Sequence, residues 1–334
     1  MTTADFAAFS NNAVMFASIV YVLAFVAHVV EWAAARTTGQ PAGQVAIPER
    51  ELVGADGATV ATPAEAAAAG GSGTGVDEDE RVDRWGRIGV ALTVVAVLLH
   101  LAALVTRGLG SDPVRVPWGN MYEFTLAGAF GVSLMYLVLG RRYHLRWMGL
   151  PVTGFEVVVL MLAVLLLYVP AGPLVPALHS YWLVIHVMAA VVASGAFAVG
   201  AIAAVLFLVK DRATRRGSLR PGGYLDRLPD LPALDRLSYR LHAFGFPIWT
   251  FAALVAGPIW AEYAWGRYWN WDPKEVWAFI TWVVSAAYLH ARATAGWRGK
   301  AAAMIALVGF ATLLFNFVGI NFFFGGGSLH SYAG

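Results

Sequence analysis

Residues 265–277 read WGRYWNWDPKEVW and place four tryptophans and a tyrosine beside an Asp-Pro-Lys-Glu charge pattern. Flat apolar rings, indole and phenol donors and opposite charges in so short a segment suit a large, flat, amphipathic ligand. The simpler alternative is an aromatic belt that anchors helix ends at a membrane surface. The density of rings and the adjoining charges favour a binding site. Its candidate residues are Trp265, Gly266, Tyr268, Trp269, Trp271, Asp272, Pro273, Lys274, Glu275 and Trp277.

Two histidines give this aromatic segment a possible metal chemistry. His186 follows Trp182 by four residues, so the two side chains share a helix face. His330 lies in the glycine-rich segment GGGSLHSYAG. The membrane topology predicted from the distribution of lysines and arginines places both histidines on the same side of the membrane as the aromatic segment. A pair of imidazoles across an aromatic platform is what bis-histidine ligation of haem iron requires, so a haem site is the leading hypothesis. A lone histidine would instead be interpreted as a hydrogen-bonded polar residue.

The charged part of the aromatic segment predicts the start of a helix. Aspartate is a favoured N-cap, proline fits the first helical turn, and glutamate at the third position can close a capping box. Asp272, Pro273 and Glu275 follow this pattern. We therefore expect a helix from about residue 273 that carries Trp277 on its first turns.

The composition is that of a polytopic membrane protein. The chain is 59% hydrophobic and 13% charged, with a mean hydropathy of +0.63. A net charge of +2 gives no reason to expect a nucleic-acid partner. There is no cysteine, so any thiol chemistry must belong to a partner. The first apolar run has neither a basic n-region nor a small-residue cleavage site, and we interpret it as a retained helix.

The apolar runs predict an all-α fold with about eight transmembrane helices. They lie near residues 11–33, 86–107, 120–140, 147–169, 181–209, 242–263, 273–294 and 301–324. Alternate connections hold 19 of the 23 lysines and arginines, and the other connections and the termini hold 4. The positive-inside rule therefore places both termini and the aromatic segment outside.

The predicted domain organisation has three parts. Residues 1–35 form the first transmembrane helix, 36–84 a linker, and 85–334 a seven-helix domain with an external loop at 262–277. The linker is rich in Ala, Gly and Pro and ends in an acidic run, which is typical of a disordered cytoplasmic segment. A docking segment is the alternative interpretation.

Three further histidines, apart from the external pair, bear on a possible inner site. His290 lies 17 residues beyond Pro273, which carries it about 25 Å inward, near the cytoplasmic boundary. It is a candidate ligand of an inner haem site, because ionisable residues at such depth are functional candidates. His28 lies at similar depth and either partners His290 or is a snorkelling helix-end residue, which is the simpler interpretation. His100 is expected to bond a neighbouring helix.

Two carboxylates have open roles. Glu156 falls inside the fourth span and must be protonated or paired. It relays protons, contacts a ligand or locks helices together, and the sequence does not choose. Glu123 lies at the outer start of the third span, where it either helps to form the external site or balances the helix N-terminus.

Four separated motifs resemble one known family. WGRYWNWDPKEVW resembles the tryptophan-rich WWD signature of haem-handling membrane proteins, in the form found in the CcsA family of system II cytochrome c biogenesis. Three further segments are similar to the same family and occur in its order. They are GNMYEF at 119–124, LVPALHSYWLVIHV at 174–187 and GINFFFGGGSLHSYAG at 319–334. The resemblance covers roughly residues 118–334.

The resemblance implies a component of a holocytochrome c synthase, or haem lyase. Such a protein, with a ResB-like (CcsB-type) partner, conveys haem b to the external face of the bacterial plasma membrane. There the haem is attached, as Fe(II), to the CXXCH segment of apocytochrome c, whose thiols an external thioredoxin-like reductant system keeps reduced. The resemblance implies His186 and His330 as external haem ligands, and His290 as an inner ligand completed by the partner.

Further residues are expected around the haem. Trp182, Glu123 and Glu156 are candidate contacts, and Arg267 or Lys274 could pair with a propionate. Two other classes of protein are possible. A bis-histidine electron-transfer cytochrome would need histidine pairs facing each other inside the bilayer. A haem-free secondary transporter would be favoured by internal repeats and intramembrane charge pairs.

Overall fold

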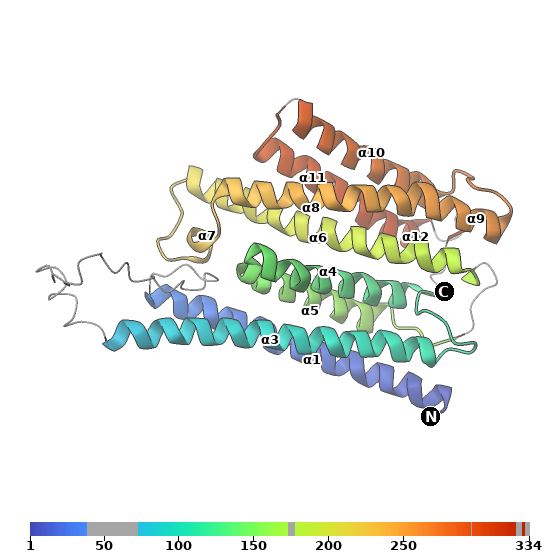
Figure 1. The fold of residues 1–334 in the computed structure, drawn as a ribbon, viewed down its shortest axis with the longest axis horizontal. Coiled ribbons are helices and arrows are strands. Elements are labelled where there is room, and N and C mark those ends of the chain that lie inside the picture. Colours follow the sequence, from blue (N-terminus) through green and yellow to red (C-terminus); the bar gives the residue numbers. More distant parts are fainter. Residues whose placement is uncertain (39–72, 173–177, 295, 325–328, 331–334) are drawn as a thin grey trace, which may run out of the picture.

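The computed structural model describes residues 1–38, 73–172, 178–294, 296–324 and 329–330, and this part of the chain is helical and without strands. The long helices run roughly parallel to one axis of an elongated bundle (Figure 1). They are α1 (Thr3–Thr38), α3 (Gly73–Leu109), α4 (Met121–Tyr143), α5 (Gly149–Leu166), α6 (Tyr181–Arg215), α8 (Leu231–Phe251), α10 (Pro273–Thr294) and α11 (Lys300–Leu314). Short elements complete it: the 3₁₀ turn η1 (Leu145–Met148), α7 (Tyr224–Arg227), α9 (Gly257–Trp265), α12 (Ile320–Phe323), and two π-helical segments, η3 (Ala252–Ala256) and η4 (Phe315–Gly319).

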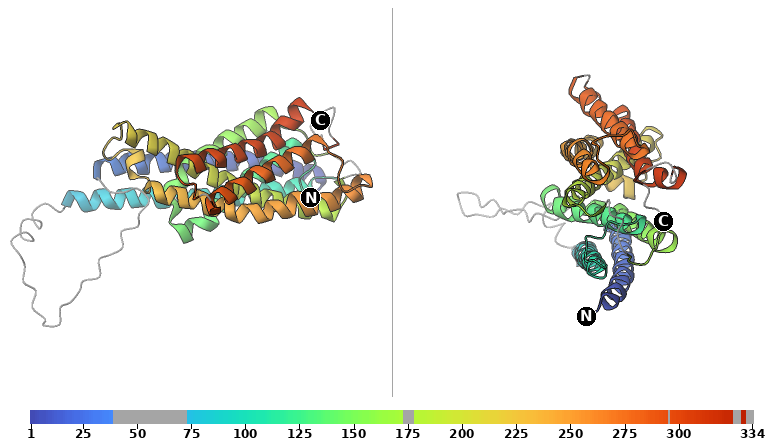
Figure 2. Two further views of the ribbon diagram at one scale, coloured as in Figure 1. Left: turned by 90° about the horizontal axis from the view of Figure 1, so that it is seen from above. Right: turned by 90° about the vertical axis from the view of Figure 1, so that its right-hand side faces the viewer.

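The helices form two groups that meet along α4 and α6. In one group α1 packs along α3 and α5, and α4 packs on α5. In the other, α6 packs on α8 and α11, and α10 on α11. The end view separates the groups clearly (Figure 2). We call the end that holds residues 266–272 the aromatic end, and the end where α6 stops and α8 begins the basic end.

Seven stretches of the described chain are long and apolar enough to cross a membrane, which confirms an all-α polytopic membrane protein. They are Thr3–Ala35, Glu80–Leu109, Met121–Tyr143, Leu145–Leu166, Tyr181–Arg215, Leu231–Trp265 and Lys300–Phe323. The eighth expected span, α10, has 22 residues but charged side chains in both terminal turns. It lies along α8 and α11, and α1 begins at the bundle end where α12 stops (Figure 1). Eight crossings would place the start of α1 and the end of α12 at the same end of the bundle, as in Figure 1. That α10 is the eighth crossing stays a prediction.

Helices extend into both ends of the segment expected to be a disordered linker. α1 continues to Thr38 and α3 already begins at Gly73, so helix occupies both ends of the predicted linker, while the division into 1–35, 36–84 and 85–334 stays a prediction. One physical reason is charge pairing along α3: Asp83 lies 3.4 Å from Arg87 one turn later, and 2.6 Å from Arg146 of η1. Residues 39–72, where the rest of the linker prediction falls, lie outside the described residues.

Glycines allow α4 and α6 to approach closely. A Cβ added at Gly195 of α6 would lie 2.7 Å from the carbonyl oxygen of Gly131 on α4. A Cβ at Gly131 would lie 2.8 Å from Val191 of α6. Small residues at helix contacts are the usual means of close approach in membranes. This crossing joins the two helix groups and so fixes the position of α6 relative to α4.

We expect Gly195→Ala to lower the thermal midpoint of unfolding in detergent, because the new methyl group meets backbone that cannot rotate away. Overpacking of this kind costs about 1–3 kcal/mol. Gly128→Ala in α4 is the control, since a Cβ there meets nothing within 4 Å. The control should be neutral or slightly stabilising, by up to about 1 kcal/mol from helix propensity. Equal midpoints for the two variants would contradict the close crossing.

Candidate functional site

The aromatic segment ends in a capping box that starts α10. The side chain of Asp272 accepts a hydrogen bond from the Lys274 N–H at 3.0 Å. Oε2 of Glu275 accepts from the Asp272 N–H at 3.1 Å and from the Asn270 N–H at 2.8 Å. The helix begins at Pro273, so the start predicted from the sequence is confirmed. These bonds hold residues 270–272 rigidly against the first turn of the helix.

The same carboxylate holds His330. Oδ1 of Asp272 lies 3.0 Å from Nδ1 of His330, and its Oδ2 accepts from the Leu329 N–H at 2.6 Å. Nζ of Lys274 donates to the His330 carbonyl oxygen at 3.3 Å. The carboxylate is 2% exposed and the imidazole 15%. Asp272 is therefore a positioning residue for His330, a role that its N-cap pattern did not reveal.

His186 is held by the backbone of a π-helical segment. Its Nδ1 lies 2.9 Å from the carbonyl oxygen of Ala252, the first residue of η3. The Gly257 N–H donates to the same oxygen, five residues along the chain. The ring also faces Gly257, where an added Cβ would lie 3.2 Å from it. π-Helical turns often occur at functional sites, and no sequence period revealed this one.

Trp260 joins the two histidines. Its ring stacks on His186 with centroids 5.9 Å apart and an interplanar angle of 13°. His330 meets it edge-on at 5.3 Å, and Trp265 meets His330 at 4.6 Å. Trp260 is 2% exposed. Sequence reasoning missed it, because it appears there as one more aromatic residue within an apolar run.

The hydrogen bonds define the tautomer of each ring. A carbonyl or a carboxylate oxygen can only accept, so Nδ1 of His186 and of His330 carries the proton in the neutral imidazole. Nε2 then holds the lone pair, and a metal-binding histidine is usually held through its other nitrogen in this way. The described residues contain no group of three or more His, Cys, Asp or Glu side chains placed to hold a bare ion. Two imidazoles fit a metal whose remaining ligands belong to its own cofactor, as the porphyrin nitrogens do in haem.

Aromatic side chains of the loop and the adjoining helix ends are exposed beside the histidines. Gly266 ends α9 with φ +70°, and the chain then turns outward. Four of these rings are between 60% and 70% exposed: Tyr181, Tyr263, Tyr268 and Trp271. Trp269 meets Trp271 edge-on at 5.8 Å, and Trp182 lies against Tyr181 at 5.6 Å. So much exposed aromatic area in one place is typical of a binding surface.

Other predicted site residues at this end lie as follows. Arg267 is exposed in the turn after α9, and Lys274 is half-buried against residue 330. Trp277 packs on Phe315 of η4, with centroids 4.1 Å apart, and so faces the bundle.

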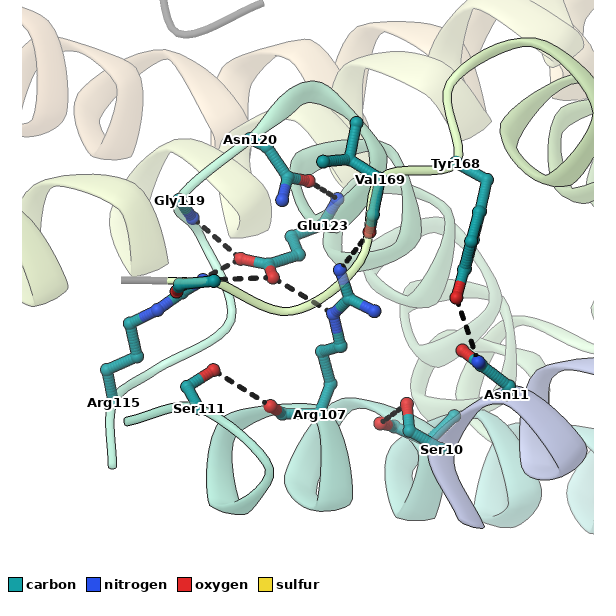
Figure 3. A network of polar contacts seen from close by, with 12 residues as sticks. Ser10, Asn11, Arg107, Ser111, Arg115, Gly119, Asn120, Glu123, Tyr168 and Val169 are labelled. Carbon is teal, nitrogen blue, oxygen red and sulfur yellow. Dashed lines mark hydrogen bonds and ion pairs between the residues drawn. The ribbon is translucent and has the colours of Figure 1, made fainter. Parts of the chain in front are cut away.

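Glu123 is the centre of a buried ion network (Figure 3). Arg107 of α3 lies 3.0 Å from Oε1, and Arg115 lies 2.6 Å from Oε2. Oε2 also accepts from the Gly119 N–H at 2.7 Å, and Asn120 caps the helix at the Glu123 N–H. Because the carboxylate is 0% exposed and both oxygens are engaged, Glu123 organises the start of α4. This geometry favours the helix-start alternative over direct contact with a ligand.

The remaining candidates lie away from the histidine pair. Glu156 is fully buried on α5. In the neighbouring helices α1 and α4, the hydroxyl of Tyr21 donates to the hydroxyl of Ser133 at 2.9 Å. His290 is exposed near the end of α10, at the basic end. Glu156 and His290 are therefore both separate from the aromatic segment.

His28 does not snorkel, and that interpretation is wrong. Its ring is 0% exposed, and its Nδ1 lies 3.0 Å from Glu31. Glu31 also pairs with Arg146 at 2.8 Å. The imidazole fits between Gly89 and Gly149, where an added Cβ would lie 2.6 and 2.3 Å from it. A buried acceptor and this glycine slot keep the ring inside the protein.

Known proteins share both the sequence and the fold. The family model for cytochrome c assembly proteins matches residues 118–326. The cytochrome c biogenesis protein CcsA of Guillardia theta is 36% identical over 261 residues, which cover 73% of this chain and 85% of that protein. CcsA of Gloeobacter violaceus is 34% identical, covering 75% and 88%. The solved structure of the cytochrome c heme lyase CcmF matches with a TM-score of 0.57 at 18% identity. That match covers 95% of this chain but 47% of that one, and it shows a shared fold.

We expect Asp272→Ala to speed amide hydrogen exchange both in the first turn of α10 and at Leu329. Asp272→Asn should speed exchange mainly at residues 329–330, because asparagine still caps a helix but loses the charged acceptor for the imidazole. Hydrogen exchange measured by mass spectrometry separates the two peptides. Unchanged exchange at Leu329 in the alanine variant would show that the carboxylate does not hold this segment.

Proposed function

The chain belongs to the CcsA family of cytochrome c biogenesis proteins, and from this premise we propose that it binds haem between His186 and His330 and attaches it to apocytochrome c. The family places this multi-pass membrane protein in cytochrome c maturation. One observation carries the finer proposal. Two imidazoles from distant parts of the chain pack on the same indole, Trp260, and each is held through Nδ1. In the proposed site, Nε2 of each imidazole ligates the iron.

The haem is a substrate, and the exposed rings of the aromatic segment are proposed to cover its faces. Tyr268 and Trp271 are exposed, and Trp271 directly precedes Asp272, whose carboxylate holds His330. Arg267, which is exposed, is the first candidate for pairing with a propionate. Lys274 is a weaker candidate because its ammonium group already donates to the His330 carbonyl. In the proposed orientation, the aromatic end faces the exterior of a bacterial plasma membrane.

The attachment chemistry needs thiols that this chain does not have. Each cysteine S–H of a CXXCH acceptor adds across a vinyl C=C of the haem: a C–S bond forms, and the hydrogen goes to the neighbouring carbon. We propose that haem b is held as Fe(II) for this step. A thioredoxin-like system outside the membrane would keep the acceptor thiols reduced. One imidazole must then leave the iron, so that the acceptor's own histidine can replace it.

A ResB-like partner is proposed to complete the route of the haem. His290 is exposed near the end of α10, so a neighbouring chain can reach it. The inner haem site would therefore use His290 and a ligand from that partner. Fully buried His28, paired with Glu31, is not available for this role.

Co-expression with a ResB-like partner and a CXXCH acceptor tests the proposed site. We expect His186→Ala and His330→Ala each to lower haem bound to the purified protein, and covalent haem on the acceptor, by about tenfold or more, since ligand loss should match or exceed the 10–100-fold effects of lost supporting residues. His179→Ala is the control, because His179 is exposed just before α6 and outside the pair. Normal haem attachment in both ligand variants would refute the site. An equal loss in the control would point to a general defect.

A second test concerns the propionate. Arg267→Ala with Lys274→Ala should reduce haem retention, and Arg267→Ala alone should account for most of the effect if the arginine pairs with the propionate. Retention is measured by the absorbance of bound haem during dilution into apomyoglobin. Unchanged retention in the double variant would exclude both residues from this pairing.

A further inference from the structure

A basic cavity lies at the opposite end of the molecule from the histidine pair. It has a volume of about 380 Å³ and opens between the start of α8, the end of α10 and the connection to α11. Its lining residues are Pro232, Asp235, Arg236, Tyr239, Arg240, Arg292 and Arg298. Four guanidinium groups and one carboxylate therefore surround the same cavity. Nothing in the proposed attachment of haem uses these residues.

The carboxylate neutralises only one of the four arginines. Nη1 of Arg292 donates to both oxygens of Asp235, at 2.7 and 2.8 Å. Oδ1 of Asp235 also accepts from the Gly299 N–H at 3.1 Å, so both carboxylate oxygens are engaged. The guanidinium of Arg292 lies over the ring of Tyr239, 4.7 Å from its centroid. Asp235 and Arg292 thus form a fixed wall of the cavity.

The other three arginines keep their charge around the cavity. Arg236 and Arg240 are one turn apart on α8 and exposed, and Arg298 is exposed in the turn before α11. Among the described residues, none of the three has a carboxylate within ion-pair distance. Arg240 has only the ring of Tyr143, 5.8 Å away. A positive charge that no carboxylate balances, gathered around one cavity, favours binding of an anion from outside the chain.

We propose that this cavity binds a phosphate-bearing anion, and that its occupant is the headgroup of an anionic phospholipid. The cavity lies at the end of an expected span, where a headgroup would be in reach. Trp297, which precedes Arg298 in the sequence, is 46% exposed, as expected for a ring at a membrane interface. Basic pockets between membrane helices are known binding sites for anionic lipid headgroups. Arginine suits phosphate because its planar fork donates two parallel hydrogen bonds.

Arginines at a membrane boundary also serve simply to orient a protein. Two features distinguish this set from scattered orienting charges. Two segments that are distant in the sequence, 232–240 and 292–298, converge on one cavity, and the carboxylate among its lining residues is already paired. An orienting role would be satisfied by any position in these connections, such as Arg212 in α6 and Arg216 just after it, which are exposed and are not among the lining residues of the cavity.

The test measures lipid binding by the purified full-length chain. The protein is delipidated in a neutral detergent, and its thermal midpoint is measured with phosphatidylglycerol, with phosphatidylcholine or with inorganic phosphate. We expect phosphatidylglycerol to raise the midpoint and phosphatidylcholine to leave it unchanged. Arg236→Gln with Arg240→Gln should weaken the apparent affinity for phosphatidylglycerol by about tenfold or more. The reason is that each basic residue near an anionic headgroup adds to the free energy of lipid binding. Lysine at both positions should restore part of it.

Arg212→Gln with Arg216→Gln is the matched control, because it also removes two exposed arginines one turn apart at the basic end. This control should bind phosphatidylglycerol like the parent. An equal loss in both double variants, or no stabilisation by any anion, would overturn the proposal. Stabilisation by inorganic phosphate equal to that by phosphatidylglycerol would retain the anion site and overturn the lipid headgroup as its occupant. Haem attachment is not a readout here, so failure of this proposal is distinguishable from failure of the proposed function.

Discussion

The Asp272 carboxylate connects the main parts of the candidate site. It starts α10 through the Lys274 N–H, and it fixes the later segment through the Leu329 N–H and the imidazole of His330. Without it, the helix would lose a cap, and one histidine would lose the acceptor that defines its tautomer. Because the group is nearly fully buried, its hydrogen bonds are stronger than they would be in water. The aromatic segment depends on this anchor for its position.

Buried ion clusters fix both ends of the helix group formed by α1, α3, α4 and α5. At the aromatic end, Glu123 joins Arg107 and Arg115, and at the other end Glu31 joins Arg146 and His28. Removing one member of such a cluster leaves an uncompensated buried charge, which typically costs about 3–5 kcal/mol. These clusters do not need to add stability relative to an apolar core. They define which helix ends meet, and so provide a rigid partner for α6.

The sequence predicted the parts of this protein that depend on local pattern. Apolar runs gave the helical spans, and the Asp-Pro-Lys-Glu pattern gave the start of α10 at its observed residue. Contacts between distant residues were not predictable, because nothing local marks them. Trp260 is indistinguishable from other tryptophans until α6 and the segment at 329–330 pack on it. Likewise, the burial of His28 requires glycines from two other helices, and the pairing of Asp83 in α3 with Arg146 joins residues that are far apart in the sequence.

The π-helical segment η3 implies a constraint on the length of the chain rather than on its composition. Its extra residue lets the Ala252 carbonyl accept from both Gly257 and His186. Deleting one residue here would let the segment close into regular α-helix, in which the Ala252 carbonyl accepts from the residue four positions along the chain. Hydropathy and membrane insertion would hardly change, yet the carbonyl that now holds His186 would change its surroundings. The spacing between Ala252 and Trp260 should therefore tolerate substitutions far better than insertions or deletions.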